Sequence, residues 1–161
     1  MEIENPKETP IDDKTDSISY RKILNNGKGL FIEMYVTGKQ PIHGYLLNIL
    51  GNYLVFYSHI FKTMFVSLHH IKWLIPYDRN FIPYSLDKEL LPGIPSNITL
   101  ADTFREQLQK HLGNIVIFDL GENPTKAGLL QKIEDNVVEL VMADGEKICW
   151  NLQHLKTVHF P

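Results

Sequence analysis

The sequence predicts a mainly β protein made of two tandem, five-stranded, strongly bent barrels, each preceded by a short N-terminal helix. Three observations predict this fold: an internal repeat whose second copy lies at a constant offset of 84, alternating apolar positions typical of strands, and turn residues that separate them. The barrels would occupy residues 20–76, called module one, and residues 100–161, called module two. An acidic tail, residues 1–19, and a proline-rich connector, residues 77–99, would complete the 161-residue chain.

The repeat is ungapped. Residues 20–76 align with residues 104–160, with ten identities in 57 positions. Because the alignment also keeps two glycines and the phase of the apolar residues, it favours gene duplication over chance. The identical pairs are Arg21–Arg105, Leu24–Leu108, Gly29–Gly113, Gly44–Gly128, Leu46–Leu130, Ile49–Ile133, Asn52–Asn136, Leu68–Leu152, His70–His154 and Lys72–Lys156.

The two segments outside the repeat differ in character. Residues 1–19 hold six acidic residues against two lysines and almost no large apolar side chains, so we expect them to be disordered. The connector region carries Pro76, Pro83, Pro92 and Pro95, which prevent regular strand pairing. Its apolar residues suggest that it lies along one or both modules.

Each module is expected to begin with a helix and continue in five strands. The helices fall at residues 18–27 and 100–111, the second one capped by Thr99 or Asp102 with Glu106 in its first turn. The strands of module one fall near residues 30–37, 44–50, 53–59, 63–68 and 71–75, and those of module two fall at the equivalent places of the repeat. The inward residues of the first strands are Ile32, Met34 and Val36, and Val116, Phe118 and Leu120.

The second strand of each module is expected to bend sharply. Leu46 and Ile49 are repeated but lie three residues apart, which breaks strict alternation and indicates a bulge. Gly44 and Gly128 would lie at the crowded entry to this bend. Between the third and fourth strands of module two, Asp144-Gly145 predicts a hairpin with a type I′ turn.

A short helix, five strands and a bent second strand together resemble the Sm-like barrel. The closing segment of module one, residues 66–76, is similar to the last strands of the bacterial Sm-like RNA chaperone, with Leu68, His69, His70 and Ile71 at matching positions and Ile75-Pro76 at the end. This resemblance implies two Sm-like barrels. In that chaperone the region of His70 contacts RNA.

Two motifs also resemble spore coat protein B of spore-forming bacilli, which is built of tandem modules. Its glycine- and lysine-rich loop is similar to residues 121–128 here. The strand that follows is similar to the runs starting at His70 and His154, which read His-Ile-Lys and His-Leu-Lys. The resemblance implies a structural protein of the spore coat or spore surface.

Several classes of function are not expected. The acidic N-terminus lacks the pattern of a signal peptide, and the chain has no apolar run of about 18 residues, so we expect synthesis in the cytoplasm and no membrane partner. The lone Cys149 excludes an intrachain disulfide and is expected to be a buried or half-buried packing thiol. No catalytic set or metal-ligand spacing is present in the sequence, so we expect neither an enzyme, a cofactor, a metal nor a small-molecule substrate.

The candidate binding surface combines positive charge with aromatic side chains. Residues 20–76 hold six Lys or Arg and one acidic residue, Glu33, which gives a charge of +5. Aromatic residues on the outer phase of the strands, Phe31 among them, are expected to be exposed. The repeated histidines are expected to cap the tight turn between strands four and five. The candidate binding residues are Tyr35, Lys39, Tyr53, Tyr57, Phe61, His70, Lys72, His154 and Lys156.

These residues are consistent with two partners. Aromatic side chains could stack on RNA bases while lysines contact phosphates, with module one as the binding face. Alternatively, the apolar outer faces cover another protein, either a second copy or a coat component. We favour protein contacts, because no arginine cluster accompanies the aromatic residues. The leading hypothesis is therefore a non-enzymatic structural or assembly protein, and the alternative is a tandem Sm-like RNA-binding protein.

Overall fold

A computed structural model describes residues 20, 22–24, 29–77, 99–121 and 126–161. The predicted disordered tail and nearly all of the predicted connector lie outside the described residues. The described part is mainly β, as predicted, with ten strands in one antiparallel sheet. We call residues 20–77 the first half and residues 99–161 the second half.

The first half contains five strands. Tyr20 and residues 22–24 are helical and precede them. The strands are β1 (Phe31–Tyr35), β2 (Ile42–Ile49), β3 (Tyr53–Ser58), β4 (Lys62–Ser67) and β5 (Trp73–Pro76), with the 3-10 helix η1 (Leu68–His70) between β4 and β5.

The second half repeats this order. Helix α2 (Phe104–Gln109) precedes the strands β6 (Ile115–Phe118), β7 (Ala127–Glu134), β8 (Val137–Val141), β9 (Lys147–Asn151) and β10 (Thr157–His159). The 3-10 helix η4 (Asp119–Gly121) follows β6. The 3-10 helix η6 (Leu152–His154) lies between β9 and β10, at the position of the repeat that η1 occupies in the first half.

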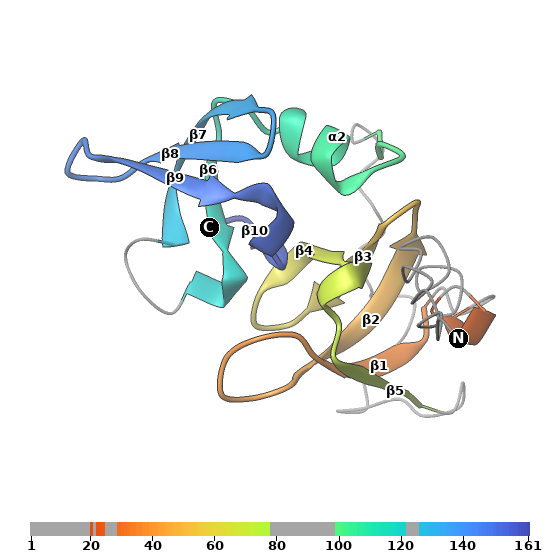
Figure 1. Cartoon of the computed structure of the whole chain (residues 1–161). Helices are drawn as coiled ribbons and strands as arrows, with labels where there is room; N and C mark the ends of the chain where they lie inside the picture. Colours follow the sequence, from red (N-terminus) through yellow and green to blue (C-terminus); the bar gives the residue numbers. More distant parts are fainter. Residues whose placement is uncertain (1–19, 21, 25–28, 78–98, 122–125) are drawn as a thin grey trace, which may run out of the picture.

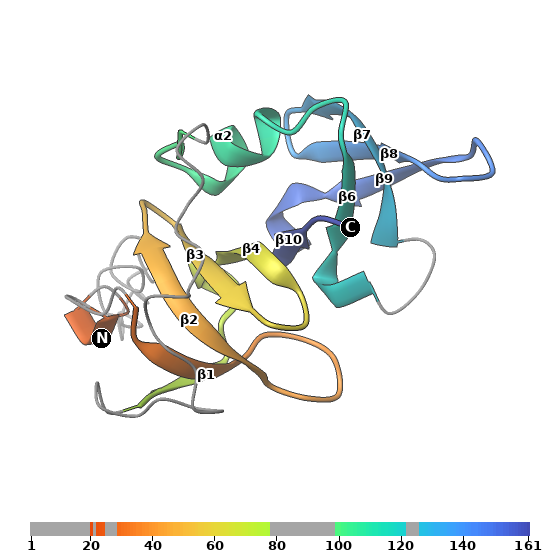
Figure 2. The ribbon, with the colours of Figure 1, turned by 180° about the vertical axis from the view of Figure 1, so that it is seen from behind.

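The ten strands follow the order β5-β1-β2-β3-β4-β10-β6-β7-β8-β9. Each half therefore has the same internal order, and the halves are joined where β4 pairs with β10 (Figures 1 and 2). In the described residues the two ends of the sheet, β5 and β9, do not pair with each other, so the sheet is not closed. In place of two tandem closed barrels, the described residues form one continuous sheet, because β10 pairs with strands of both halves.

The backbone repeats in detail. The register shift in β2 falls between Leu46 and Asn48, and that in β7 falls between Leu130 and Lys132, so the predicted bulge is present at the same place in each half. The amide of Leu68 donates to the carbonyl oxygen of Asn52 at 3.0 Å, and the equivalent bond, Leu152 to Asn136, measures 2.8 Å. The sequence repeat is thus a structural repeat as well.

Two glycines allow the sheet to bend at the bulged strands. A Cβ on Gly44 would collide with the backbone oxygen of Tyr57 and with the ring of Phe56. A Cβ on Gly128 would lie 2.7 Å from the backbone oxygen of Val141, the equivalent of Tyr57. The predicted crowding at both positions is therefore confirmed, and it explains why no side chain is tolerated there.

The halves have separate but adjoining apolar cores. The first includes Ile32, Met34 and Val36, the inward set predicted for the first strand. The second contains Val116 and Phe118, together with three residues of the first half: Tyr53, Val55 and Phe65. Leu120, predicted to point into module two, is only partly buried and packs against the core of the first half.

Two details differ from the sequence-based expectations. Helix α2 is capped by Thr103, whose side chain accepts a hydrogen bond from the amide of Glu106, rather than by Thr99 or Asp102. The hairpin at Asp144-Gly145 is present, but only the glycine has a positive φ (88°), and its amide donates to the carbonyl oxygen of Met142. A type I′ turn requires two positive φ angles, so the turn is of another type.

Candidate functional site

The junction between the halves, which we call the seam, brings distant parts of the chain together. Val66, Phe65 and Met64 of β4 lie opposite Thr157, Val158 and His159 of β10. The amide of Ser67 extends this ladder by donating to the carbonyl oxygen of Lys156 at 2.9 Å. Because β10 also pairs with β6, the seam makes one hydrogen-bonded surface of both halves.

Asp119 holds the start of β10 in place. Its carboxylate is buried, and Oδ1 accepts hydrogen bonds from the amides of Lys156 (2.8 Å) and Thr157 (3.2 Å). The Lys156 Nζ lies 3.9 Å from Oδ2 of the same carboxylate. In the first half, Tyr35 occupies the equivalent position, and Lys72 Nζ lies 5.0 Å from the centre of its ring.

Aromatic rings fill the seam beside the β4–β10 ladder. Phe65 is 3% exposed and packs on both His111 (5.5 Å between ring centres) and Phe160 (5.9 Å), which also contact each other. Tyr53 contacts Phe65 and the first residue of α2, Phe104. Helix α2 therefore contacts β3 of the other half through Phe104, and His111, just after the helix, contacts Phe65 of β4. Figure 2 shows α2 lying beyond the ends of these strands.

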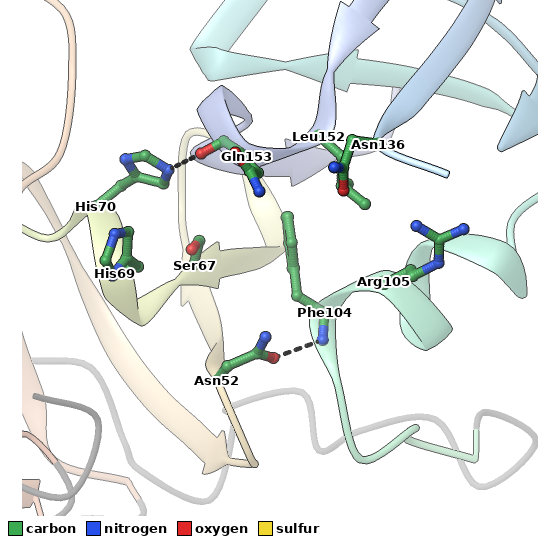
Figure 3. Close-up of a pocket in the computed structure, with 9 residues that line it drawn as sticks. All are labelled: Asn52, Ser67, His69, His70, Phe104, Arg105, Asn136, Leu152 and Gln153. Atoms are coloured by element: carbon green, nitrogen blue, oxygen red, sulfur yellow. Dashed lines mark hydrogen bonds between the residues drawn. The ribbon is translucent and has the colours of Figure 1, made fainter. Parts of the chain in front are cut away.

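A pocket of about 380 Å³ opens at one end of the seam (Figure 3). It lies where η1 and the β2–β3 turn face α2, η6 and the β7–β8 turn. The side chains around it include amides, imidazoles and one guanidinium. The lining residues are Asn52, Ser67, His69, His70, Phe104, Arg105, Asn136, Leu152 and Gln153.

Two of these side chains, His70 and Asn52, are held by backbone groups of the opposite half, and Arg105 is held by one of its own half. Nε2–H of His70 donates to the carbonyl oxygen of Gln153 at 2.6 Å, and Oδ1 of Asn52 accepts from the amide of Phe104 at 2.7 Å. The guanidinium of Arg105 donates to the carbonyl oxygen of Asp135. Amide, imidazole and guanidinium groups together can bind a polar planar group or an anion through hydrogen bonds.

Burial changes the pKa of titratable groups along the seam. It lowers the pKa of His70, against the opposing effect of the hydrogen bond to Gln153. Burial also lowers the pKa of His111 and of His159, whose Nδ1 has no hydrogen-bond partner among the described residues. Burial, with the nearby Asp102 and Glu106, raises the pKa of Tyr53 to about 12. All four groups are therefore uncharged at neutral pH.

The lowered histidine pKa values predict that the protein loses stability in acid. In the unfolded chain these imidazoles have the ordinary pKa of 6.5. Below that pH the unfolded state binds more protons than the folded state, so the free energy of unfolding falls from pH 6.5 down to the folded pKa values. Within that window buried His159 contributes up to about 1.4 kcal/mol per pH unit. Urea unfolding across the range measures this loss.

The variant His159→Gln tests the attribution to the seam. It removes one of the three titrating groups, so the loss of stability between pH 6.5 and the folded pKa values should be smaller than in the wild type. Two profiles that run parallel throughout the acidic range would contradict this attribution.

The nine candidate binding residues do not form one surface. Tyr35 and Lys72 contact each other at the β1–β5 side, and Tyr35 stacks on Trp73. Lys39 and His154 are exposed, and Lys156 is held by Asp119. Of the nine, only His70 lines the seam pocket.

Three expectations about exposure are wrong. Tyr53 is fully buried and Phe31 nearly so, because each lies under other rings or under the second half. Tyr57 and Phe61 are half-buried, and Phe61 packs on His159. Cys149 is exposed rather than packed, because β9 is an edge strand in the described structure.

The role predicted for the repeated histidines is also corrected. His70 does not cap its own turn: it bonds to the backbone of η6 across the seam. Apart from His70, the residues that line the pocket, among them Asn52, Phe104, Arg105 and Gln153, were not predicted as site residues. The repeat did contain a signal for some of them, since Asn52–Asn136 and Leu68–Leu152 are among its ten identities.

Within the described residues, no group of three or more His, Cys, Asp or Glu side chains is placed to hold a metal ion. Among the same residues, no helix is both long enough and apolar enough to cross a membrane.

The fold and the seam define a mainly β protein whose two similar halves share one sheet. The chain belongs to the YwrJ family. It is 49% identical over 157 residues to the uncharacterized protein YwrJ of Bacillus subtilis (strain 168), covering 98% of this chain and 70% of that relative. The family description "YwrJ third domain" matches residues 103–158, from the N-cap of α2 to β10. No solved structure matches the chain significantly.

Proposed function

We propose that this chain is a non-enzymatic assembly protein of the spore-coat type, built of two Sm-like modules that associate through their strand edges. The observation that carries the proposal is the seam itself, in which the last strand of the second half is buried against an edge of the first half. A module that joins its neighbour in this way is suited to build larger protein assemblies.

The order of elements supports the Sm-like interpretation. In each half a helical segment precedes five antiparallel strands, the second strand is bulged, and a 3-10 helix separates the last two strands. In each half the fifth strand pairs with the first, so each half curls back on itself. Leu74 lies opposite Met34 in the first half, and Val158 lies opposite Phe118 in the second. These two pairs occupy equivalent positions of the repeat.

The organism of the related protein and the apolar character of the seam support an assembly role. The relative comes from a Bacillus, the group of bacteria to which the coat-protein resemblance points. The seam buries large apolar side chains such as Phe65 and Val158, which is characteristic of permanent rather than transient contacts.

The coat assignment is tested by locating the protein in the bacterium that makes it. Immunoblots of growing cells, sporulating cells and extracted coats should show the protein appearing during sporulation and remaining with the coat fraction. A protein that is abundant in growing cells and missing from extracted coats would exclude the coat role.

A second candidate function, RNA binding, is favoured by the seam pocket. Arg105, His69 and His70 lie around it with three side-chain amides, and the first half has a charge of +5. Side-chain amides can hydrogen-bond to the edges of unpaired bases, while cationic groups contact phosphates.

Fluorescence polarisation with short U-rich and A-rich RNAs, at low and at physiological salt, tests this second candidate. Binding through the pocket should persist at physiological salt and should weaken at least about tenfold in Arg105→Gln. Lys132→Gln, which removes the same charge from an exposed residue of β7, is the matched control. Binding that disappears with salt, or that both variants reduce equally, would indicate nonspecific attraction.

A further inference from the structure

The two ends of the sheet are repeat equivalents of the two strands that form the seam. Strand β9 of the second half is the equivalent of β4, and β5 of the first half is the equivalent of β10. Strands β4 and β10 meet inside the chain, whereas within the described residues β9 and β5 end the sheet. Each molecule therefore carries both partners of a second seam, on opposite ends.

The end strands expose several side chains whose repeat equivalents the seam buries. Thr157, Val158 and His159 of β10 are all buried. In β5, Trp73, the equivalent of Thr157, is 41% exposed, and Ile75, the equivalent of His159, is 46% exposed. On the other edge, Phe65 is buried and its equivalent Cys149 is exposed. Large apolar side chains exposed on an edge strand are characteristic of a surface that pairs with another strand.

We propose that β9 of one chain pairs antiparallel with β5 of a second copy of the chain, in the register of the internal seam. This inference rests on the proposed edge-to-edge function and adds the partner and the register. The register follows when each residue of the β4–β10 pairs is replaced by its repeat equivalent. On β5 and β9 respectively, the facing pairs are then Trp73 and Trp150, Leu74 and Cys149, and Ile75 and Ile148. Every one of these facing pairs is apolar.

The same replacement predicts the polar contacts that flank the new ladder. The seam bond from the Ser67 amide to the Lys156 carbonyl becomes a bond from the Asn151 amide to the Lys72 carbonyl of the second copy. The bond from His70 to the Gln153 carbonyl becomes one from exposed His154 to the His69 carbonyl of the second copy. His154, the repeat equivalent of His70, would then donate to a backbone carbonyl oxygen as His70 does.

The proposed contact joins two different edges, so it is heterologous. Each added chain presents a fresh β9 at one end and a fresh β5 at the other. Association of this kind continues until the assembly closes into a ring, or extends as a filament if the rotation does not close.

The lone cysteine makes a direct test possible. In Leu74→Cys the introduced thiol should lie opposite the native Cys149 of a second copy, within the Cα separation that a disulfide requires. Under mild oxidation this variant should form disulfide-linked dimers and higher multimers about tenfold faster than Ile60→Cys, in which the added thiol is exposed but away from both edges. Multimers beyond the dimer require both edges of each chain.

A second variant tests the contact between chains without crosslinking. Trp73→Glu places a charge at an exposed position of β5, so the fold should be retained and the mass measured by light scattering should drop to that of the monomer. Equal crosslinking of Leu74→Cys and Ile60→Cys, or a wild-type protein that is monomeric at micromolar concentration, would overturn the proposal. Either result leaves the coat assignment open, because that depends on the fractionation experiment.

Discussion

The variant Phe65→Ala is expected to lose about 3–5 kcal/mol of the free energy of unfolding, measured by urea denaturation. Phe65 is buried at the centre of the seam, between Tyr53 of its own half and His111 and Phe160 of the other. Removing the ring leaves a cavity that neighbours on a hydrogen-bonded sheet cannot fill, so the loss combines burial and cavity terms. The segment after helix α2 should also loosen from β4, because His111 loses its contact with the ring of Phe65.

Cys149→Ala is the matched control, because Cys149 occupies the equivalent position in the repeat but is exposed. It should change the free energy of unfolding of the monomer by about 0.5 kcal/mol or less. If both variants lost equally little stability, the two halves would not be packed on each other at Phe65. If Phe65→Ala instead unfolded in two separate steps, the seam would be the element that makes unfolding cooperative.

The local structure could be predicted from the sequence because it depends on neighbouring residues. Apolar alternation placed the strands, and the spacing of Leu46 and Ile49 indicated the bulge that the register of β2 and β3 contains. The glycine at the bend was also predictable, since Gly44 has no room for a side chain. The repeat gave each prediction twice, at equivalent positions of the two halves.

Strand alternation did not predict the seam, because it says nothing about which strand edges meet. Alternation placed Tyr53 on the outer face, yet four consecutive residues from Tyr53 to Phe56 are buried. The run is continuously apolar, which is typical of a strand covered on both faces, and this signal outweighs alternation here. Phe65 and Cys149 share one position in the repeat and differ in burial because His111 and Phe160 pack on Phe65.

The pocket residues could not be predicted for the same reason: the sequence does not indicate which segments meet across the seam. Asn52 and Asn136 have equivalent backbone bonds, but only Asn52 caps the amide of Phe104 in the other half. The sequence therefore marked these positions as repeated without indicating that they would meet across the seam.

The second large effect is expected at Asp119, whose carboxylate joins η4 to the start of β10. Asp119→Ala leaves the amides of Lys156 and Thr157 without their acceptor in a buried place, at a cost of about 1–3 kcal/mol for each. The residue also has a positive φ of 47°, which aspartate adopts more readily than alanine. We therefore expect the free energy of unfolding to fall by roughly 3 kcal/mol, with exchange of the β10 amides accelerated most.

Asp119→Asn separates the hydrogen bonds from the charge. Asparagine keeps an oxygen acceptor for the two amides and tolerates the left-handed backbone, so this variant should retain most of the stability that alanine loses. The free energy of unfolding that Asp119→Asn still loses measures the attraction between the carboxylate and the Lys156 ammonium, which is 3.9 Å away and partly screened by solvent. Equal losses in both variants would mean that the charge, and not the capping of β10, stabilises this end of the seam.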